Sequence, residues 1–588
     1  MVNQQKQKQE EAPVALVGKK PAAYGSVING QHGSGTSSGA TGLPAVCLCI
    51  LGVELCERLA FYTFTGTQEF FLERLGYSLS EAGGLNATMG TLCMAWALFA
   101  GWTADVIFGR YRTILVFGLL YALGAVIAAC AAFPSVGSAK AYLVGVLLFV
   151  PIGTAGIKAN ISNFGADQYD TSDPAQAAAQ EKFFSWFYLS INIGSAVAYG
   201  YLTTMGSNGG LGVPKSYGYF AVYAIAAGCM VLAVGLFCSG RAHYRMQPVQ
   251  SRSALGGVAA LVSAAARGGS RQAKIFSAGL FLLATGILLS VAQALMPEAS
   301  FAGSFGGAAF ACAAVGTAAV VFPCLDASWV TEAPTQEEAL PATEVRSFLR
   351  LLPVLFTANL AFSTLYNSMQ FWYQQQACQM DLRVPFGAPG AQFSGSFFMI
   401  ADCLGIVVAT PLAVGWLNPA LERRLGPLFG HGAKFGLGMA FAGVSVLMAT
   451  RFEIVRRTAP VLELSSNCAP NGVRMSAFSA AWMTVPFFLM GMGEIYTQPV
   501  LMHLAYRGSP PSMRTLAAAT GLVISAVSTS LFSVQVEALS RYVPNDLNCG
   551  HLEYGYICNL LLAGVFYITH LRALRCFEEG EPTEVHSL

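Results

Sequence analysis

Charged residues are the scarcest class in this 588-residue chain. Asp, Glu, Lys and Arg together make up 11% of the sequence, whereas hydrophobic residues make up 54%. One soluble core cannot hide that many apolar residues, so the composition excludes an ordinary soluble protein and indicates an integral membrane protein. The formal net charge of +2 gives no sign of a nucleic-acid partner or of a large acidic one.

Enzyme motifs are also missing from the sequence. There is no His-Glu-x-x-His zinc motif, and the only Gly-x-Ser-x-Gly stretch is GTSSG at 35–39. That stretch lies in a low-complexity tail, where the strand-to-helix elbow of a hydrolase cannot form. We therefore expect a protein that is not an enzyme and that uses neither a cofactor nor a metal.

The N-terminus lacks the apolar segment that follows the basic start of a signal peptide. Residues 1–42 are instead rich in Gln, Lys, Ser and Gly, which predicts a disordered cytosolic tail and no cleaved leader. The 15 cysteines are mostly scattered through apolar runs, where Cys acts as a small hydrophobe. Cys468 and Cys549 fall in predicted outward loops, and the sequence leaves open whether they form a bridge.

Apolar runs, by contrast, are abundant. A spanning helix needs roughly 20 mostly apolar residues. The sequence supplies fourteen candidates: 43–72, 83–107, 112–133, 140–163, 183–204, 217–238, 275–296, 300–325, 351–378, 393–416, 432–450, 478–504, 516–540 and 553–571. These runs predict an all-α membrane protein with many spans.

A long segment divides these runs into six and six. We expect a six-helix bundle over 43–238, a linker over 239–350, a second bundle over 351–572 and a cytosolic tail over 573–588. Two six-helix halves joined by a long insertion resemble the major facilitator superfamily, whose halves enclose a site near the bilayer midplane. The runs 275–296 and 300–325 would be accessory helices; a re-entrant or surface pair is the alternative.

The stretch GWTADVIFGRYR (101–112) resembles the superfamily's cytosolic loop between the second and third helices. Asp105 can cap a helix end and pair with Arg110 or Arg112, which would make a latch between conformations. A solvated turn is the plainer alternative. Lys and Arg also cluster in the other predicted cytosolic segments, which favours a cytosolic N-terminus; Arg451, Arg456 and Arg457 lie on the wrong side for this orientation.

The first apolar run carries an unexpected polar stripe. At 100° per residue, Glu54, Glu57, Arg58, Tyr62 and Thr65 fall on one face of a helix. A charge facing lipid at the bilayer centre costs about 2.5–3.5 kcal/mol, so the stripe must face protein or water. The spacing allows an ion network between Arg58 and the two glutamates, either for function or only for packing.

Further ionisable residues lie inside other predicted spans, namely Lys158, Asp402 and Glu494. In formal charge, the two glutamates of the first helix offset Arg58 and Lys158, whereas Asp402 and Glu494 leave the second half at minus two. Such a polarised cavity fits a zwitterion, with its carboxylate toward the cations and its ammonium toward the acids. An inorganic anion fits less well unless both acids are protonated.

Several motifs resemble the proton-dependent oligopeptide transporter family, also called the peptide transporter or plant nitrate/peptide family. ELCERLAFY resembles its first-helix signature Glu-x-x-Glu-Arg-Phe-x-Tyr-Tyr, and FFSWFYLSINIGSAV (183–197) its fifth-helix signature. GIKANISNFGADQYD is similar to its fourth helix, and GEIYTQPVLMHLAY to its tenth. These matches run from about residue 50 to 525 in the family's order.

The resemblance implies roles for particular residues. A proton-handling cluster would comprise Glu54, Glu57, Arg58 and Lys158. Arg58 and Lys158 would also meet the substrate carboxylate, Asn192 and Glu494 would bind its amine, and Tyr62 would donate a hydrogen bond to the peptide backbone. By the charge count above, Asp402 joins Glu494 in facing the ammonium. The implied function is proton-coupled symport of di- and tripeptides by alternating access.

Departures from the family pattern leave the substrate open. Phe61 replaces the first Tyr of the pair, Asn367 and Ser368 stand where peptide carriers often have Asp and Gln, and Asp402 stands where Asn is common. A carrier of nitrate or another small organic anion is the alternative, although no His lies in 351–378, where nitrate-type members can use one. A substrate sensor that does not transport is a third class. We expect the plasma membrane, with the vacuolar or lysosomal membrane as alternatives.

Overall fold

The structure is a computed structural model, and it describes residues 45–170, 173–249, 253–296, 302–332, 340–385 and 390–578. The tail predicted at 1–42 and most of the tail predicted at 573–588 lie outside the described residues. Within them, every one of the fourteen predicted runs is helical. The fold is therefore the expected all-α membrane fold.

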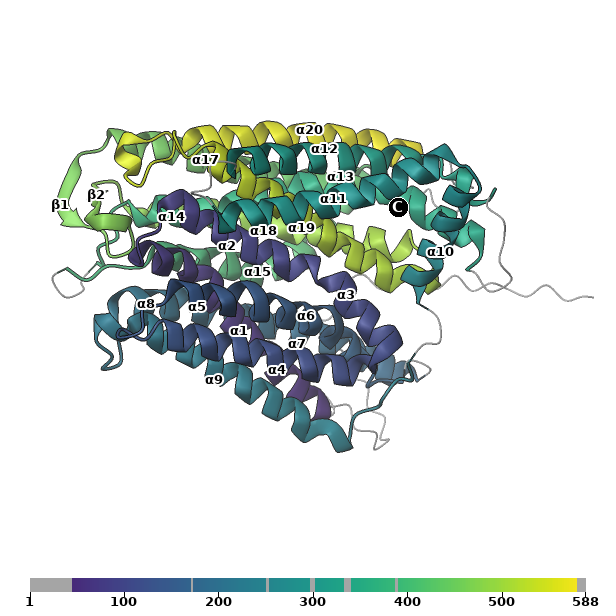
Figure 1. The fold of residues 1–588 in the computed structure, drawn as a ribbon, viewed down its shortest axis with the longest axis horizontal. Coiled ribbons are helices and arrows are strands. Elements are labelled where there is room, and N and C mark those ends of the chain that lie inside the picture. Colours follow the sequence, from purple (N-terminus) through teal and green to yellow (C-terminus); the bar gives the residue numbers. More distant parts are fainter. Residues whose placement is uncertain are drawn as a thin grey trace, which may run out of the picture.

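The first half of the chain contains six of the predicted spans. Its helices are α1 (Ala45–Arg74), α2 (Leu79–Ala95), α3 (Ala97–Trp102), α4 (Gly109–Ala131), α5 (Ala139–Val144), α6 (Val150–Ala166), α7 (Pro174–Val197), α8 (Thr203–Asn208) and α9 (Gly218–Ser239). Single π-helical segments, Thr103–Ile107, Gly145–Phe149 and Ala198–Leu202, interrupt three of these spans. In Figure 1 most of this half forms the lower group of helices.

The second half repeats this plan. Its helices are α13 (Ala342–Asn367), α14 (Gln374–Cys378), α15 (Ile400–Leu412), α16 (Asn418–Leu425), α17 (His431–Thr458), α18 (Thr484–Arg507), α19 (Arg514–Ala538) and α20 (Glu553–Glu578). The only strands among the described residues, β1 (Val461–Ser465) and β2 (Arg474–Ser476), form an antiparallel pair between α17 and α18. We call the end of the molecule with this pair and α14 the outer end, and the opposite end, with α3 and α10 (Ala254–Arg267), the inner end (Figure 1).

The insertion contains two long helices, α11 (Arg271–Leu295) and α12 (Ala302–Cys324), which lie side by side and contact α19 (Figure 1). Each is long and apolar enough to cross a membrane, at about 1.5 Å of rise per residue. Small residues let them approach closely: a Cβ added to Gly316 would lie 3.0 Å from the carbonyl oxygen of Gly279. These features favour accessory spanning helices over a surface pair.

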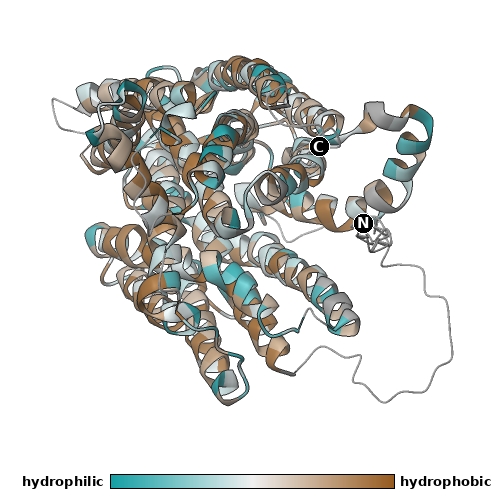
Figure 2. Ribbon diagram, turned by 90° about the vertical axis from the view of Figure 1, so that its right-hand side faces the viewer, coloured by the Kyte–Doolittle hydropathy of each residue, from teal (hydrophilic) through white to brown (hydrophobic). Residues whose placement is uncertain are grey.

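Eleven helices among the described residues meet the length and hydropathy requirements of a membrane span. The other three predicted runs, α1, α7 and α18, are also helical, and each carries at least one of the polar residues singled out above, such as Glu54, Asn192 and Glu494. Figure 2 shows the bundle nearly along its helices, with hydrophobic residues over most of the ribbon. The protein is a multi-pass integral membrane protein.

Two of the three arginines on the unexpected side are neutralised locally. Arg456 is fully buried and donates to both carboxylate oxygens of Glu453 at 2.8 Å, while Arg457 pairs with Glu553 at 2.8 Å. A count of exposed positive charge should therefore discount these two residues, and only Arg451 of the three stays exposed.

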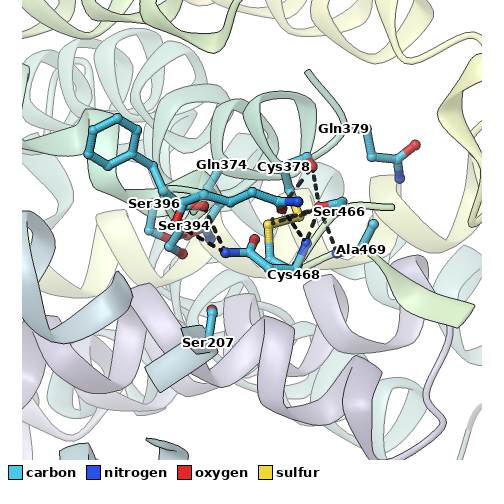
Figure 3. The surroundings of a disulfide bond; sticks show 12 residues. Ser207, Gln374, Cys378, Gln379, Ser394, Ser396, Ser466, Cys468 and Ala469 are labelled. Carbon is cyan, nitrogen blue, oxygen red and sulfur yellow. Dashed lines mark hydrogen bonds between the residues drawn. A yellow bond between two sulfur atoms is a disulfide. The ribbon is translucent and has the colours of Figure 1, made fainter. Parts of the chain in front are cut away.

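The disulfide differs from the one considered from sequence. Cys468, in the loop between β1 and β2, is bonded to Cys378 at the end of α14, and Cys549 is free and exposed (Figure 3). Sequence reasoning placed Cys378 inside a spanning run and so did not consider it as a partner. The bond fastens the strand pair to the outer end of α14.

Candidate functional site

The polar stripe of α1 forms a compact ion network. Arg58 Nε lies 3.3 Å from Glu54 Oε1, and the guanidinium also pairs with Glu57. All three side chains are buried, with 4%, 0% and 4% of Glu54, Glu57 and Arg58 exposed. One oxygen of each glutamate has no hydrogen-bond partner, so the network retains unused acceptors. The helical periodicity of the sequence predicted this arrangement.

Aromatic rings cover the same guanidinium. The Arg58 Cζ lies 4.9 Å from the ring centre of Phe61 and 5.9 Å from that of Tyr62. A cation over an aromatic face is attracted by the ring quadrupole. Phe61 therefore supplies the same cation–π attraction to Arg58 that a Tyr would supply at this position, but it cannot donate a hydrogen bond.

Lys158 on α6 faces this network. It is partly exposed, and its Nζ lies 3.5 Å from the sulfur of Met94. Its charge interacts with Glu54, Glu57 and Arg58, and also with Glu494 of the second half. Among the described residues Lys158 makes no ion pair, so it has a charge available for another group.

The second half contributes two acids that make no ion pair among the described residues. Asp402 on α15 is 7% exposed, its Oδ1 has no hydrogen-bond partner, and its charge interacts with that of Glu494 on α18. The two helices meet at Gly491, where an added Cβ would lie 2.9 Å from Asp402 Oδ1. A larger residue at 491 would therefore displace the acid.

Four tyrosines surround these acids. Tyr62, Tyr188, Tyr199 and Tyr366 all interact electrostatically with Asp402, Glu494 or both. Tyr188 is 40% exposed although it faces the acids. Sequence analysis assigned a role only to Tyr62, because an aromatic in an apolar helix looks the same whether it packs or lines a cavity.

Asn192 lies on α7 next to this region. It is 5% exposed, and its Nδ2 donates to the carbonyl oxygen of Tyr188 at 2.9 Å. One turn later, Ser195 Oγ lies 3.0 Å from Cys403 Sγ, which joins α7 to α15 beside Asp402. Asn192 is therefore placed near the second-half acids. We call Glu54, Glu57, Arg58, Lys158, Asp402 and Glu494 the central cluster.

Two of the residues that depart from the family pattern lie elsewhere. Asn367 Nδ2 donates to Ser528 Oγ at 3.3 Å, and Ser368 Oγ accepts from Asn559 Nδ2 at 2.7 Å. Both side chains are buried, at 3% and 0% exposure. They join α13 and the following turn to α19 and α20, so they serve packing within the second half.

The expected latch has a different ion pair. Arg110 pairs with Asp167 at the end of α6, and Asp105 makes no ion pair among the described residues, although it lies within electrostatic range of Arg110. Arg112 is exposed. In this structure Arg110 is therefore bonded to a partner 57 residues away in sequence, and the latch of Asp105, Arg110 and Arg112 stays a prediction.

Sequence analysis missed a second polar group on α1, nearer the outer end. Glu69 accepts hydrogen bonds from Gln374 and Gln375 of α14, and Glu73 lies one helical turn further along. We call these four residues the outer seam. A count of every ionisable residue in and just after the predicted run 43–72 would have included both glutamates. The glutamines that contact Glu69 come from the other half of the chain, so the sequence did not indicate them.

Comparisons with known proteins agree on one family. The model of the POT family matches residues 111–549. Protein NRT1/PTR FAMILY 8.5 of Arabidopsis thaliana is 28% identical over 601 aligned positions, which cover 93% of this chain and 92% of that protein. The POT family transporter PepTSo has a TM-score of 0.71 at 21% identity, over 92% of this chain and 99% of its own. An auto-inhibited POT family peptide transporter has a TM-score of 0.69 at 23% identity, over 93% and 100%.

Proposed function

Since this chain belongs to the POT family, and is thus a transporter rather than an enzyme, we propose that it is a proton-coupled symporter of di- and tripeptides that works by alternating access. The observation that carries this proposal is the central cluster. An arginine and a lysine with two glutamates on the first half face two acids on the second half.

The cluster suits a zwitterion. The substrate carboxylate would approach Arg58 and Lys158, and its ammonium would approach Glu494, Asp402 and Asn192. Each charge of the guest then meets opposite charge in a site that is largely shielded from water, where an unpaired ion costs several kcal/mol. Tyr62 lies beside Arg58 and would donate to the peptide backbone.

Protons would be coupled through Arg58. Glu54 and Glu57 hold the guanidinium while both are ionised. A proton on either acid would weaken that pair and free Arg58 for the peptide carboxylate, and loss of the proton would restore it. The proton and the substrate carboxylate thus both act on the ion pairs of Arg58 with Glu54 and Glu57. This would couple the transport of the substrate to the transport of the proton.

Alternating access would be a rocking of the halves 43–238 and 351–572, with 239–350 as the connection. At the inner end, the latch would involve Arg110 together with Asp105 and Arg112. The ion pair of Arg110 with Asp167 ties the start of α4 to the end of α6 and would hold this part of the first half as one body during the motion.

The alternative substrate is nitrate or another small organic anion. Two acids without cations of their own at the site disfavour it, because an anion would add a third negative charge. Asn367 and Ser368 differ from the family pattern of peptide carriers, but both side chains serve packing. These two differences therefore no longer argue against a peptide substrate. We place the protein in the plasma membrane, where an inward proton gradient can drive uptake, with the vacuolar or lysosomal membrane as alternatives.

Uptake by purified protein in liposomes tests the proposal. Labelled di-alanine should accumulate when the exterior is acid, and accumulation should stop when a protonophore removes the gradient. Excess unlabelled dipeptide should compete and nitrate should not. Accumulation of labelled nitrate under the same gradient, without accumulation of the dipeptide, would replace the peptide symporter with the anion carrier.

A further inference from the structure

The outer seam holds an acidic pair that the proposed peptide site does not use. Glu69 and Glu73 lie one turn apart near the end of α1, with 0% and 4% of their side chains exposed. Burial of two carboxyl groups so close together needs compensation from hydrogen bonds or from protons. The two acids differ sharply in how they obtain it.

Glu69 is well supplied with donors. Gln374 Nε2 donates to its Oε2 at 2.8 Å, Gln375 Nε2 donates to its Oε1, and Asn86 Nδ2 lies 3.5 Å from Oε2. Gly83 leaves room for these contacts, since an added Cβ there would lie 2.9 Å from Gln375 Nε2. Gln374 is held in turn by Ser396, whose Oγ donates to it at 2.7 Å (Figure 3).

These contacts join the two halves of the molecule. Glu69 belongs to α1, whereas both glutamines belong to α14. Other hydrogen bonds between the halves gather at the same end: Asn208 donates to the Gln392 carbonyl oxygen at 2.5 Å, and Leu79 N donates to Asn545 Oδ1 at 2.8 Å. The two glutamine donors of Glu69 are therefore present only while the outer end is closed, whereas Asn86 belongs to the first half.

Glu73 has no such support. Neither of its carboxylate oxygens has a hydrogen-bond partner in the part of the chain that the structure describes. The neighbouring residue in sequence, Arg74, is turned toward the Lys215 carbonyl oxygen at 3.4 Å and lies over the ring of Tyr219 at 5.6 Å. A charged Glu73 would therefore be a buried, unpaired ion next to a second carboxylate.

Other acidic and phenolic groups lie toward the same end of the molecule. From α2, Glu81 is engaged by Ser78 at 2.7 Å, and from α19, Glu537 interacts with Glu81. From α9 comes the phenol of Tyr219, which interacts with Glu73. The side chains of α14 that contact Glu69 are neutral amides. Among the described residues, neither Glu69 nor Glu73 makes an ion pair.

We propose that Glu69 and Glu73 form a second proton-binding site, separate from the central cluster, and that the outer end closes only when this pair holds a proton. The donors of α14 fix the negative charge on Glu69, so Glu73 carries the proton. When the outer end opens, water replaces the amides and the proton can leave to the outer solution. The inference rests on the proposed alternating access and adds a proton requirement to one of its steps.

Hydrogen–deuterium exchange of the full chain in lipid nanodiscs tests this without substrate or gradient. Backbone protection over 66–76 and 370–379, corrected for the intrinsic pH dependence of exchange, should fall at least about threefold in the wild type between about pH 5.5 and about pH 8. Glu73→Gln, which mimics the protonated acid, should stay protected throughout. Glu73→Met, similar in volume and uncharged, should do the same if the glutamine variant does not purify.

Glu537→Gln is the matched control, because it removes another carboxylate near the outer end without touching Glu69 or Glu73. It should keep the pH dependence of the wild type. Equal pH dependence in Glu73→Gln and the wild type, or none in the wild type, overturns the proposal. Protection at high pH restored by sodium but not by choline would also overturn it, since the pair would then bind a metal cation.

The outcome is separable from that of the proposed function. Di-alanine uptake that succeeds while protection is independent of pH removes the second proton site alone. Protection that depends on pH through Glu73, combined with no peptide uptake, removes the peptide symporter and leaves the proton site in place.

Discussion

Two acidic groups on the same helix, α1, are stabilised in opposite ways. In the central cluster, Glu54 and Glu57 share Arg58 of their own helix, so this network is complete within the first half. In the outer seam, Glu69 depends on amides from the second half and Glu73 has no partner. The ion pairs of Arg58 lie within one half, so a substrate can replace them without any movement of the halves. The hydrogen bonds of Glu69 to α14 cross between the halves, so they form or break when the halves move.

The strongest test of this difference removes the shared cation. Arg58→Gln leaves Glu54 and Glu57 buried without a counter-charge and removes the group that would bind the substrate carboxylate. Uptake of di-alanine should fall about a hundredfold or more. Arg58→Lys should restore little, because an ammonium cannot reproduce the planar fork of donors.

Initial rates in liposomes, normalised to folded protein by size-exclusion chromatography, measure this effect. Arg541→Gln, which removes an exposed arginine near the outer end, is the control and should transport as the wild type does. Substantial uptake by Arg58→Gln would contradict the role given to the central cluster.

A smaller effect is expected from the acids of the second half. Glu494→Gln should weaken di-alanine binding about tenfold, because a charge-assisted hydrogen bond to the ammonium is lost. The variant should bind an N-acetylated dipeptide as well as the wild type does, since that ligand has no ammonium. Competition uptake with both ligands measures the difference, and equal losses for the two would show that Glu494 does not face the amine.

The outer seam should give a still smaller change in transport. Gln375→Leu removes one donor of Glu69 and should change the uptake rate about threefold, the range of a single hydrogen bond. Its affinity for di-alanine should stay the same, because the central cluster is untouched. A large loss of affinity would mean that the two regions of α1 are not independent.

The disulfide should matter least for transport. Cys468→Ser frees the strand pair from α14, which should lower the apparent melting temperature in a thermal scan, as loss of a native cross-link usually does. Uptake at room temperature should change less than about twofold, since no residue of the central cluster contacts this loop. Cys549→Ser should leave both measurements unchanged.

Much of the fold follows from local patterns in the sequence. All fourteen predicted runs are helices, because the length of an apolar run is a local property. The stripe on α1 was predictable for the same reason, since Glu54, Glu57 and Arg58 meet within one turn.

Contacts between distant segments were not predictable. Arg110 pairs with Asp167 rather than Asp105, and Cys468 bonds to Cys378 rather than Cys549. The two glutamines that donate to Glu69 are separated from it by 305 and 306 positions in the sequence. Each of these contacts depends on how distant helices pack against one another. No regular spacing in the sequence indicates which residues will meet.

A proton on Glu54 or Glu57 should free Arg58 for the peptide carboxylate, and transport by Glu57→Gln in liposomes examines this coupling. This variant should still exchange labelled for unlabelled di-alanine at equal pH but should no longer accumulate it when the exterior is acidified. Accumulation by Glu57→Gln to the level of the wild type under the same gradient would contradict it.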